Sequence, residues 1–230
     1  MEGSILHEEP VKKRIDTLRA IVFDFDGVIL ESADIKTAAF MALYAAFPER
    51  LPAIREYHLS NAGISRYVKF EYIQTKILGL PYTDRDRALR SAEFERLTHE
   101  QILRCQEVKG AAALLRGLKN RVMRIVASGT PQDELRIIVA GRGMAGWFEE
   151  VWGTPLTKPE ILRDVLARHQ LSAGGVLMVG DAMNDYQSAQ ETGVRFLARE
   201  TGSTFAGMTV DKVRDLGEMG EWLEETDDRP

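Results

Sequence analysis

Three short and almost continuous apolar runs stand out along the chain, at Leu18–Phe25, Val122–Ala127 and Val176–Val179. Each run ends in a cluster of small or turn-forming polar residues, which is typical of strands that are buried on both faces of a parallel sheet. Between and after these runs, apolar positions recur at helical spacing. The expected helices are Gly110–Leu118, Pro131–Ala140, Pro159–His169 and Ala182–Thr192. This alternation predicts an α/β fold with a doubly wound parallel sheet.

One long stretch breaks the alternation. From Asp34 to Glu107 the pattern stays helical, with no convincing strand. Its breaks fall near Pro48, Pro52, Gly63 and Gly79–Pro81. We therefore predict a core domain of residues 1–33 and 108–230, and an inserted α-helical cap domain of residues 34–107. Open α/β sheets bind ligands outside the carboxyl ends of their strands, so the insert is placed to act as a lid. One more helix is expected beyond Thr209.

Composition narrows the range of partners and locations. The 230 residues are 44% hydrophobic and 28% charged, with a formal net charge of -5, so nothing in the bulk charge attracts nucleic acid or anionic membranes. Cys105 is the only cysteine, which excludes an intrachain disulfide and a cysteine-rich zinc cluster. No apolar run approaches the roughly 20 residues that span a bilayer, and the charged segment Met1–Arg19 lacks a secretory apolar region. We expect a cytoplasmic protein with no nucleic-acid or membrane partner, and leave the oligomeric state open.

Two carboxylates close the first strand in the string IVFDFDGVI. Asp24 and Asp26 are two residues apart, a spacing that sends both side chains to one face of a strand. Buried carboxylates need partners, so the pair indicates a bound cation or a chemical role. The competing interpretation is a solvated turn, because Asp-Gly is common turn chemistry.

A second acidic pair follows the strand in LMVGDAMND. Asp181 ends that strand and Asp185 lies one helical turn later. Together with the first pair, these carboxylates could hold Mg²⁺, which binds one or two carboxylates together with water and phosphate oxygens. Asp181 could equally cap a helix, with Asp185 only decorating its first turn.

Groups suited to an anion lie in two other segments. In IVASGTPQDELR, Thr130 is expected to be a helix N-cap and Pro131 the first helical residue, and the Ser128 hydroxyl and free backbone N–H groups suit phosphate oxygens. The same residues would also cap a helix without any ligand. Lys158 precedes Pro159, which favours an extended backbone that could send its ammonium into the crevice. Most lysines are simply solvated, so Lys158 matters only as the cation that accompanies the carboxylates.

The order DFDGV, VASGT, TKPE, GDAMND resembles the haloacid dehalogenase-like hydrolase superfamily. The resemblance covers residues 18–32 and 108–198, and the intervening helices look like the family's cap. It implies a phosphatase that forms an aspartyl-phosphate and requires Mg²⁺. Asp24 would be the nucleophile and Asp26 the general acid/base. The metal would be held by the Asp24 side chain, the Asp26 backbone carbonyl and the Asp181 side chain.

The resemblance also implies roles for the remaining motif positions. Ser128 and Gly129 would lie at the phosphate, Lys158 would balance its charge, and Asp185 would be the second acidic position near the metal. Gly129 stands where related enzymes often have asparagine, so a side-chain contact to phosphate is absent there. The expected substrate is a small phosphorylated metabolite such as a sugar phosphate.

Cap side chains should recognise the organic part of the substrate. The candidates are Lys36, Asn61, Arg66 and Lys69. Arg66 and Lys69 share a helical face, although an ordinary solvated face is the competing interpretation. His58, His99 and His169 lack a metal-ligand spacing and are interpreted as structural.

Two other functions remain open at this point. A sugar phosphomutase of the same superfamily would share every core motif, but family mutases that act on hexose phosphates often have histidine where this chain has Lys36. A noncatalytic phosphometabolite-binding protein could retain the fold. A dehalogenase is disfavoured, because those relatives lack the acid that Asp26 supplies.

Overall fold

A computed structural model describes residues 12–227 and contains a six-stranded sheet. All of its neighbouring strands are parallel, in the order β3-β2-β1-β4-β5-β6. The strands are β1 (Ala20–Phe23), β2 (Met123–Pro131), β3 (Glu150–Thr154), β4 (Val176–Gly180), β5 (Arg195–Arg199) and β6 (Asp211–Val213). The predicted doubly wound parallel fold is therefore confirmed.

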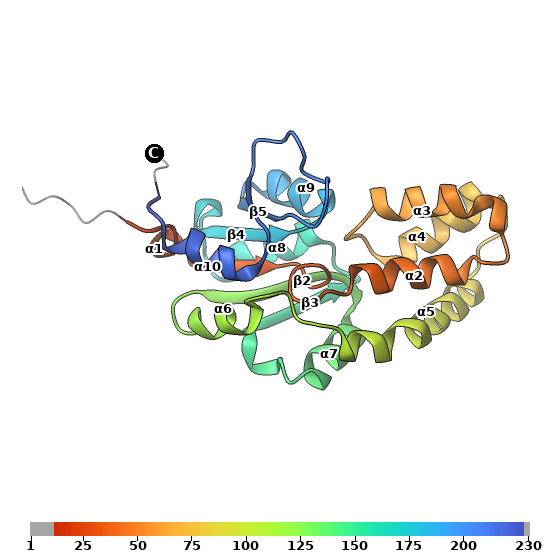
Figure 1. Cartoon of the computed structure of the whole chain (residues 1–230), viewed down its shortest axis with the longest axis horizontal. Coiled ribbons are helices and arrows are strands. Elements are labelled where there is room, and N and C mark those ends of the chain that lie inside the picture. Colours follow the sequence, from red (N-terminus) through yellow and green to blue (C-terminus); the bar gives the residue numbers. More distant parts are fainter. Residues whose placement is uncertain (1–11, 228–230) are drawn as a thin grey trace, which may run out of the picture.

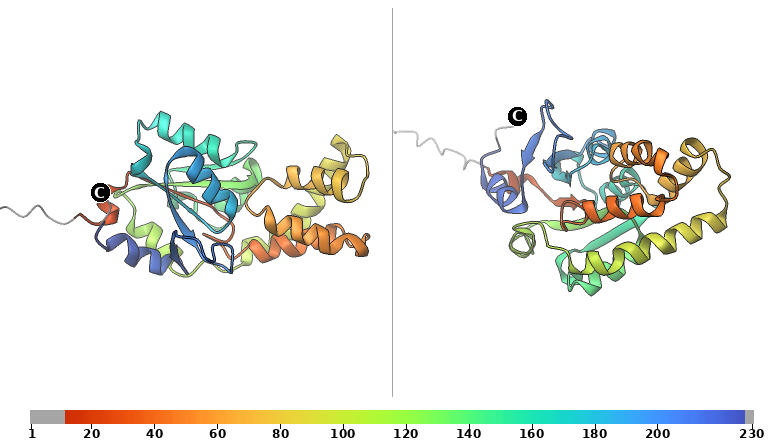
Figure 2. Two further views of the ribbon diagram at one scale, coloured as in Figure 1. Left: turned by 90° about the horizontal axis from the view of Figure 1, so that it is seen from above. Right: turned by 45° about the vertical axis from the view of Figure 1, so that its right-hand side comes forward.

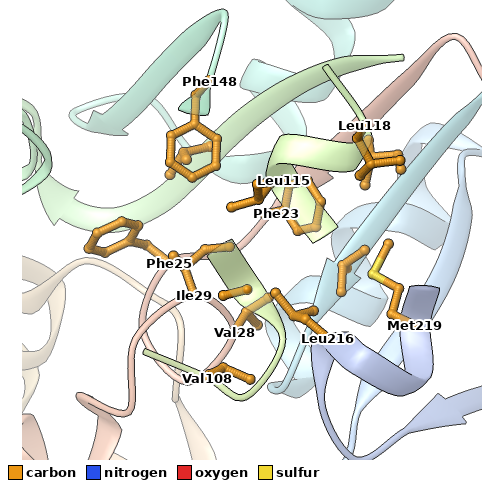
Figure 3. Close-up of a cluster of buried hydrophobic side chains, with 14 of the residues drawn as sticks. Phe23, Phe25, Val28, Ile29, Val108, Leu115, Leu118, Phe148, Leu216 and Met219 are labelled. Carbon is orange, nitrogen blue, oxygen red and sulfur yellow. The ribbon is translucent and has the colours of Figure 1, made fainter. Parts of the chain in front are cut away.

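Helices cover both faces of the sheet (Figure 1). The core helices and short helical turns are α1 (Arg14–Thr17), α6 (Ala111–Gly117), α7 (Gln132–Gly141), η3 (Ala145–Trp147), α8 (Lys158–Arg168), η4 (Ala173–Gly175), α9 (Met183–Thr192) and α10 (Leu216–Glu224). Ile21 and Phe23 of β1 belong to the cluster under α6, α7 and α10, part of which Figure 3 shows. Ala20 and Val22 belong to the opposite cluster, under α8 and α9. This alternation follows from the period of two along a strand.

Two predicted helix starts are wrong. Lys158 is not extended but is the first residue of α8, and the extended N-cap residue is Thr157. Thr130 is not a helix N-cap and Pro131 is not the first helical residue, because β2 continues through Pro131 and pairs there with Thr154. Pro131 is the N-cap residue, and α7 begins at Gln132. The extended backbone keeps the Thr130 side chain at the end of the sheet, where its hydroxyl contacts Asp26.

The helices between β1 and α6 form a cap with an apolar core of its own. They are α2 (Ala33–Leu43), η1 (Pro48–Arg50), α3 (Leu51–Ser60), α4 (Arg66–Tyr72), η2 (Ile73–Ile77) and α5 (Asp84–Arg104). Phe40, Phe70 and Phe94 are fully or almost fully buried in it, with ring centroids 5.0 to 6.1 Å apart. Figures 1 and 2 show these helices beyond one end of the sheet, opposite the C-terminus.

The helical cap agrees with the predicted architecture, while the predicted domain boundaries at 33/34 and 107/108 stay predictions. Residues 1–11 and 228–230, which were assigned to the core domain, lie outside the described residues. Between residues 12 and 227, no helix combines the length and the apolar composition that crossing a membrane requires.

Candidate active site

Three carboxylates lie close together at the topological switch point of the sheet, where the strand order reverses. The chain places β2 and β3 on one side of β1, and β4 to β6 on the other, so the carboxyl ends of β1 and β4 flank a crevice. Asp24 follows β1, and Asp181 and Asp185 follow β4. Oxygen atoms of these three carboxylates lie within 4.8 Å of one another. The two predicted acidic pairs thus contribute to one cluster.

Lys158 is the ammonium partner of this cluster. Asp24 continues the β1 alternation on the side of Val22, which faces α8, and Lys158 is the first residue of α8. Its Nζ lies 3.1 Å from Asp24 Oδ1 and also pairs with Asp185. Burial raises the pKa of Asp24 to about 7, although Lys158 acts in the opposite direction. Burial alone would lower the pKa of Lys158, but Asp185 and Asp24 raise it above its ordinary value.

Asp181 lies against the turn that follows β1. Gly27 adopts φ +78°, and a Cβ there would lie 2.2 Å from Asp181 Oδ2, so only glycine fits. Burial, followed by the charges of Asp24 and Asp185, raises the pKa of Asp181 well above its usual range. No ion pair to Asp181 is found within residues 12–227. Three carboxylates with one ammonium leave excess negative charge, and oxygen ligands of this kind fit Mg²⁺.

Asp185 is held by two donors of the protein itself. One oxygen accepts from Lys158, and Oδ2 accepts from the Ala182 backbone N–H at 3.1 Å. A Cβ on Gly180 would lie 2.2 Å from Cβ of Asp185, so the strand must end in glycine for this carboxylate to fit. Asp185 therefore positions Lys158, and it also lies near the predicted metal site.

Asp26 has surroundings of its own. Its Oδ1 accepts from Ser32 Oγ at 2.6 Å, and its Oδ2 accepts from Thr130 Oγ1 at 3.2 Å and from Lys36. Burial alone would raise the pKa of Asp26, but the Lys36 ammonium and these hydrogen bonds together lower it. The sequence did not identify Ser32 or Thr130 as partners of Asp26. Lys36, a predicted contact of the organic part of the substrate, contacts the proposed acid/base and Thr130 Oγ1, the latter at 2.6 Å.

The predicted phosphate segment lies at the end of β2. Ser128 is buried, and its Oγ accepts from the Thr130 backbone N–H at 3.2 Å. A Cβ on Gly129 would lie 2.6 Å from the Gly63 carbonyl oxygen, which also accepts from Asn184 Nδ2 at 3.3 Å. The cap segment between α3 and α4 therefore rests directly on Gly129. This contact gives a physical reason for glycine rather than asparagine at that position.

The cap cations are buried, so the solvated-face interpretation of Arg66 and Lys69 is wrong. Each residue is 4% exposed. Arg66 Nη2 pairs with Glu134 of α7 at 2.6 Å, a link between cap and core. Asn61, in contrast, donates to the Tyr57 carbonyl within the cap and does not line the cavity described next.

A cavity of about 730 Å³ is lined by several of these residues, but Ser128, Lys158 and Asp185 are not among its lining residues. Asp24, Asp26 and Asp181 line its core side, while Arg66 and Lys69 line its cap side. The cavity is thus lined by carboxylates of the core and by buried cations of the cap, and its volume suits a small molecule.

Comparison with known proteins agrees with this arrangement. The family model of haloacid dehalogenase-like hydrolases matches residues 21–199. A phosphoglycolate phosphatase from Photobacterium profundum is 26% identical over 188 residues, covering 77% of this chain and 81% of the relative. The HAD hydrolase YfnB from Bacillus subtilis, bound to magnesium, superposes with a TM-score of 0.66 and 18% identity, covering 90% of this chain and 99% of YfnB. CbbY from Rhodobacter sphaeroides, in complex with xylulose-1,5-bisphosphate, gives a TM-score of 0.70 and 16% identity, with coverage of 90% and 100%. From the four motifs, the fold and the family match, we conclude that the chain belongs to the haloacid dehalogenase-like hydrolases.

Proposed function

We propose that this phosphatase hydrolyses small phosphorylated metabolites in a magnesium-dependent reaction, with an aspartyl-phosphate formed on Asp24. The observation that carries the proposal is the buried Asp24 carboxylate, 3.1 Å from Lys158 and clustered with Asp181 and Asp185. The phosphatase names of curated relatives support the reaction class.

In the first half of the reaction, an Asp24 oxygen attacks phosphorus and the bond from phosphorus to the leaving oxygen breaks. The leaving oxygen takes a proton from the Asp26–Lys36 pair. In the second half, Asp26 accepts a proton from the water that attacks the aspartyl-phosphate, releasing inorganic phosphate. The lowered pKa of Asp26 means that the resting carboxylate is ionised, which suits the base role. Lys36 is then the nearest source of the proton for the acid role.

Magnesium would be held by the side chains of Asp24 and Asp181 and by the Asp26 backbone carbonyl, with Asp185 nearby. Bound there, it would offset the repulsion between the acidic cluster and a phosphate dianion. Lys158 would contribute to the same charge balance, and Ser128 would hold a phosphate oxygen. The magnesium named for the Bacillus subtilis neighbour is in keeping with this proposal.

Asp24→Asn and Asp26→Asn variants test the assignment with an aryl phosphate, whose leaving group needs little protonation. Asp24→Asn should lower turnover by at least about 10³-fold and form no adduct. Asp26→Asn should still form aspartyl-phosphate and then accumulate it, because the water lacks its base. Acid-quenched mass spectrometry detects the added phosphoryl group on the peptide that contains both acids, and circular dichroism checks folding.

Normal turnover by a folded Asp24→Asn protein would overturn the nucleophile assignment. An adduct located on Asp26 would reverse the two roles. Incubation of the wild-type enzyme with sugar phosphates separates the remaining alternatives. Release of phosphate supports a hydrolase, and formation of an isomerised product supports a mutase. If neither product forms, a noncatalytic binding protein is supported.

A further inference from the structure

The cap side of the active-site cavity contains an ammonium group with no acidic partner. Lys69 of α4 is 4% exposed, and no ion pair joins it to a carboxylate anywhere in the described part of the chain. Its Nζ lies 3.4 Å from both Nδ1 and the backbone oxygen of His58. A buried ammonium that meets only neutral groups is unfavourable unless a ligand supplies the missing charge.

His58 cannot supply that charge. Its Nε2 lies 3.1 Å from Thr37 Oγ1, and its ring lies 4.3 Å from the ring of Phe40, centroid to centroid. Burial and then the nearby Lys69 lower the pKa of His58 to about 3, so the imidazole is neutral at physiological pH. A neutral ring accepts a hydrogen bond from Lys69 and orients it, but it does not balance the charge.

Arg66, one helical turn before Lys69, offers a second unused donor. Its Nη2 is occupied by Glu134, and its guanidinium carbon lies 4.4 Å from the centre of the Phe94 ring. Nη1 is buried and has no hydrogen-bond partner among residues 12–227. Buried donors of this kind are almost always satisfied, so the orphan Nη1 points to a missing acceptor.

Both residues line the same cavity as the proposed catalytic carboxylates Asp24 and Asp26, with Phe40 and Phe94 also among its lining residues. We propose that Lys69 and Arg66 Nη1 bind a second anionic group of the substrate, a carboxylate or a phosphate, while its phosphoryl group meets Asp24. The proposal rests on the function proposed above. Burial, then Lys36 and Lys158, lower the pKa of Lys69 to about 7, and a bound anion would hold this group in its charged form.

Matched substrates test the subsite by turnover. Phosphoglycolate carries a carboxylate where 2-hydroxyethyl phosphate carries a hydroxyl, and ethylene glycol bisphosphate carries a second phosphate. We expect the wild-type kcat/KM to favour one or both anionic esters over the hydroxyl ester by about 10- to 100-fold, the range expected for a charge-assisted hydrogen bond. Lys69→Met should remove most of that preference through KM, and Lys69→Arg should restore part of it. The exposed Lys76 provides the control variant Lys76→Met, which should keep the wild-type preference.

Binding of non-hydrolysable probes makes the test independent of catalysis. Calorimetry in the presence of Mg²⁺ should show tighter binding of phosphonoacetate than of ethylphosphonate, with the difference reduced in Lys69→Met. Equal binding of the two probes by the wild-type protein would overturn the subsite, whatever the variants do. Preferential binding of phosphonoacetate without hydrolysis of any ester would support the subsite and refute the proposed function.

Discussion

At the residue scale, charge in this site is divided between two sides of one cavity. Asp24 and Asp185 pair with Lys158, and Asp26 pairs with Lys36. Asp181 has no ion pair within residues 12–227. Excess negative charge thus lies on the core side, and the unpaired Lys69 lies on the cap side. A metal ion and an anionic substrate would neutralise the two sides in turn.

The pKa of Lys69 makes a prediction about stability. Its folded value of about 7 lies below its ordinary value of 10.5, so between these pH values the unfolded chain binds more protons and the free energy of unfolding rises with pH. The cost of burying the ammonium is therefore fully present below pH 7 and relieved as pH rises toward 10.5. Lys69→Met should be more stable than wild type at pH 7, and its advantage should shrink by a few kcal/mol at pH 9.5.

Urea unfolding at the two pH values measures this change, with Lys76→Met as the control. The charged groups that act on Lys69 are Lys36, Lys158, Asp26 and Asp24. His58 stays neutral in both states above pH 7, because its folded and ordinary pKa values are about 3 and 6.5. An advantage of Lys69→Met that is the same at both pH values would contradict the assigned burial cost.

At the scale of elements, the strands that contain an apolar run were predictable, and the strands that lack one were not. β1 and β4 have no polar side chain and β2 contains the run Ile125–Ala127, but β5 begins and ends with arginine and β6 has only three residues. The acidic residues of the candidate site could be predicted because they follow buried strands. The Arg66–Glu134 pair could not, since its members are 68 positions apart and only the folded chain brings them together. Thr130 was misassigned because Ser-Gly-Thr-Pro is typical of a helix start, whereas pairing with β3 keeps the segment extended.

The contact between the cap segment and β2 makes a prediction about Gly129. A methyl group there would lie 2.6 Å from Gly63 O and 3.0 Å from the Ile64 backbone, so the cap segment must shift. Gly129→Ala should raise KM for the metabolite substrate by about tenfold or more, since displacements near 1 Å strongly affect positioning. Gly117→Ala is the matched control, because a Cβ meets nothing within 4 Å at that position in α6. Steady-state kinetics of both variants test this prediction. An unchanged KM in Gly129→Ala would show that the cap segment at Gly63 does not rest on Gly129 during turnover.

At the scale of the whole molecule, the cap and the core are joined around the reaction centre. Lys36 of α2 reaches Asp26 and Thr130, Arg66 of α4 reaches Glu134, and the segment at Gly63 rests on Gly129. These links surround the cavity from several sides. Movement of the cap would therefore change the surroundings of the proposed acid/base and of the proposed anion subsite together.

Assembly of the acidic cluster by folding leads to the last prediction, on magnesium and stability. Asp24 and Asp181 are far apart in sequence and meet only in the native state, so a metal that binds them stabilises the folded protein. The free energy of unfolding should rise by about 1.4 kcal/mol for each tenfold increase of Mg²⁺ above its Kd. The response should be larger at pH 8 than at pH 6, because protons compete with the metal for Asp24, whose pKa is about 7. Thermal unfolding followed by circular dichroism, at constant ionic strength and at both pH values, measures this stabilisation by magnesium. Asp181→Asn should lose most of the magnesium response, because it removes one of the carboxylates proposed to hold the ion. An equal response in wild type and Asp181→Asn would place the stabilising ion elsewhere on the molecule.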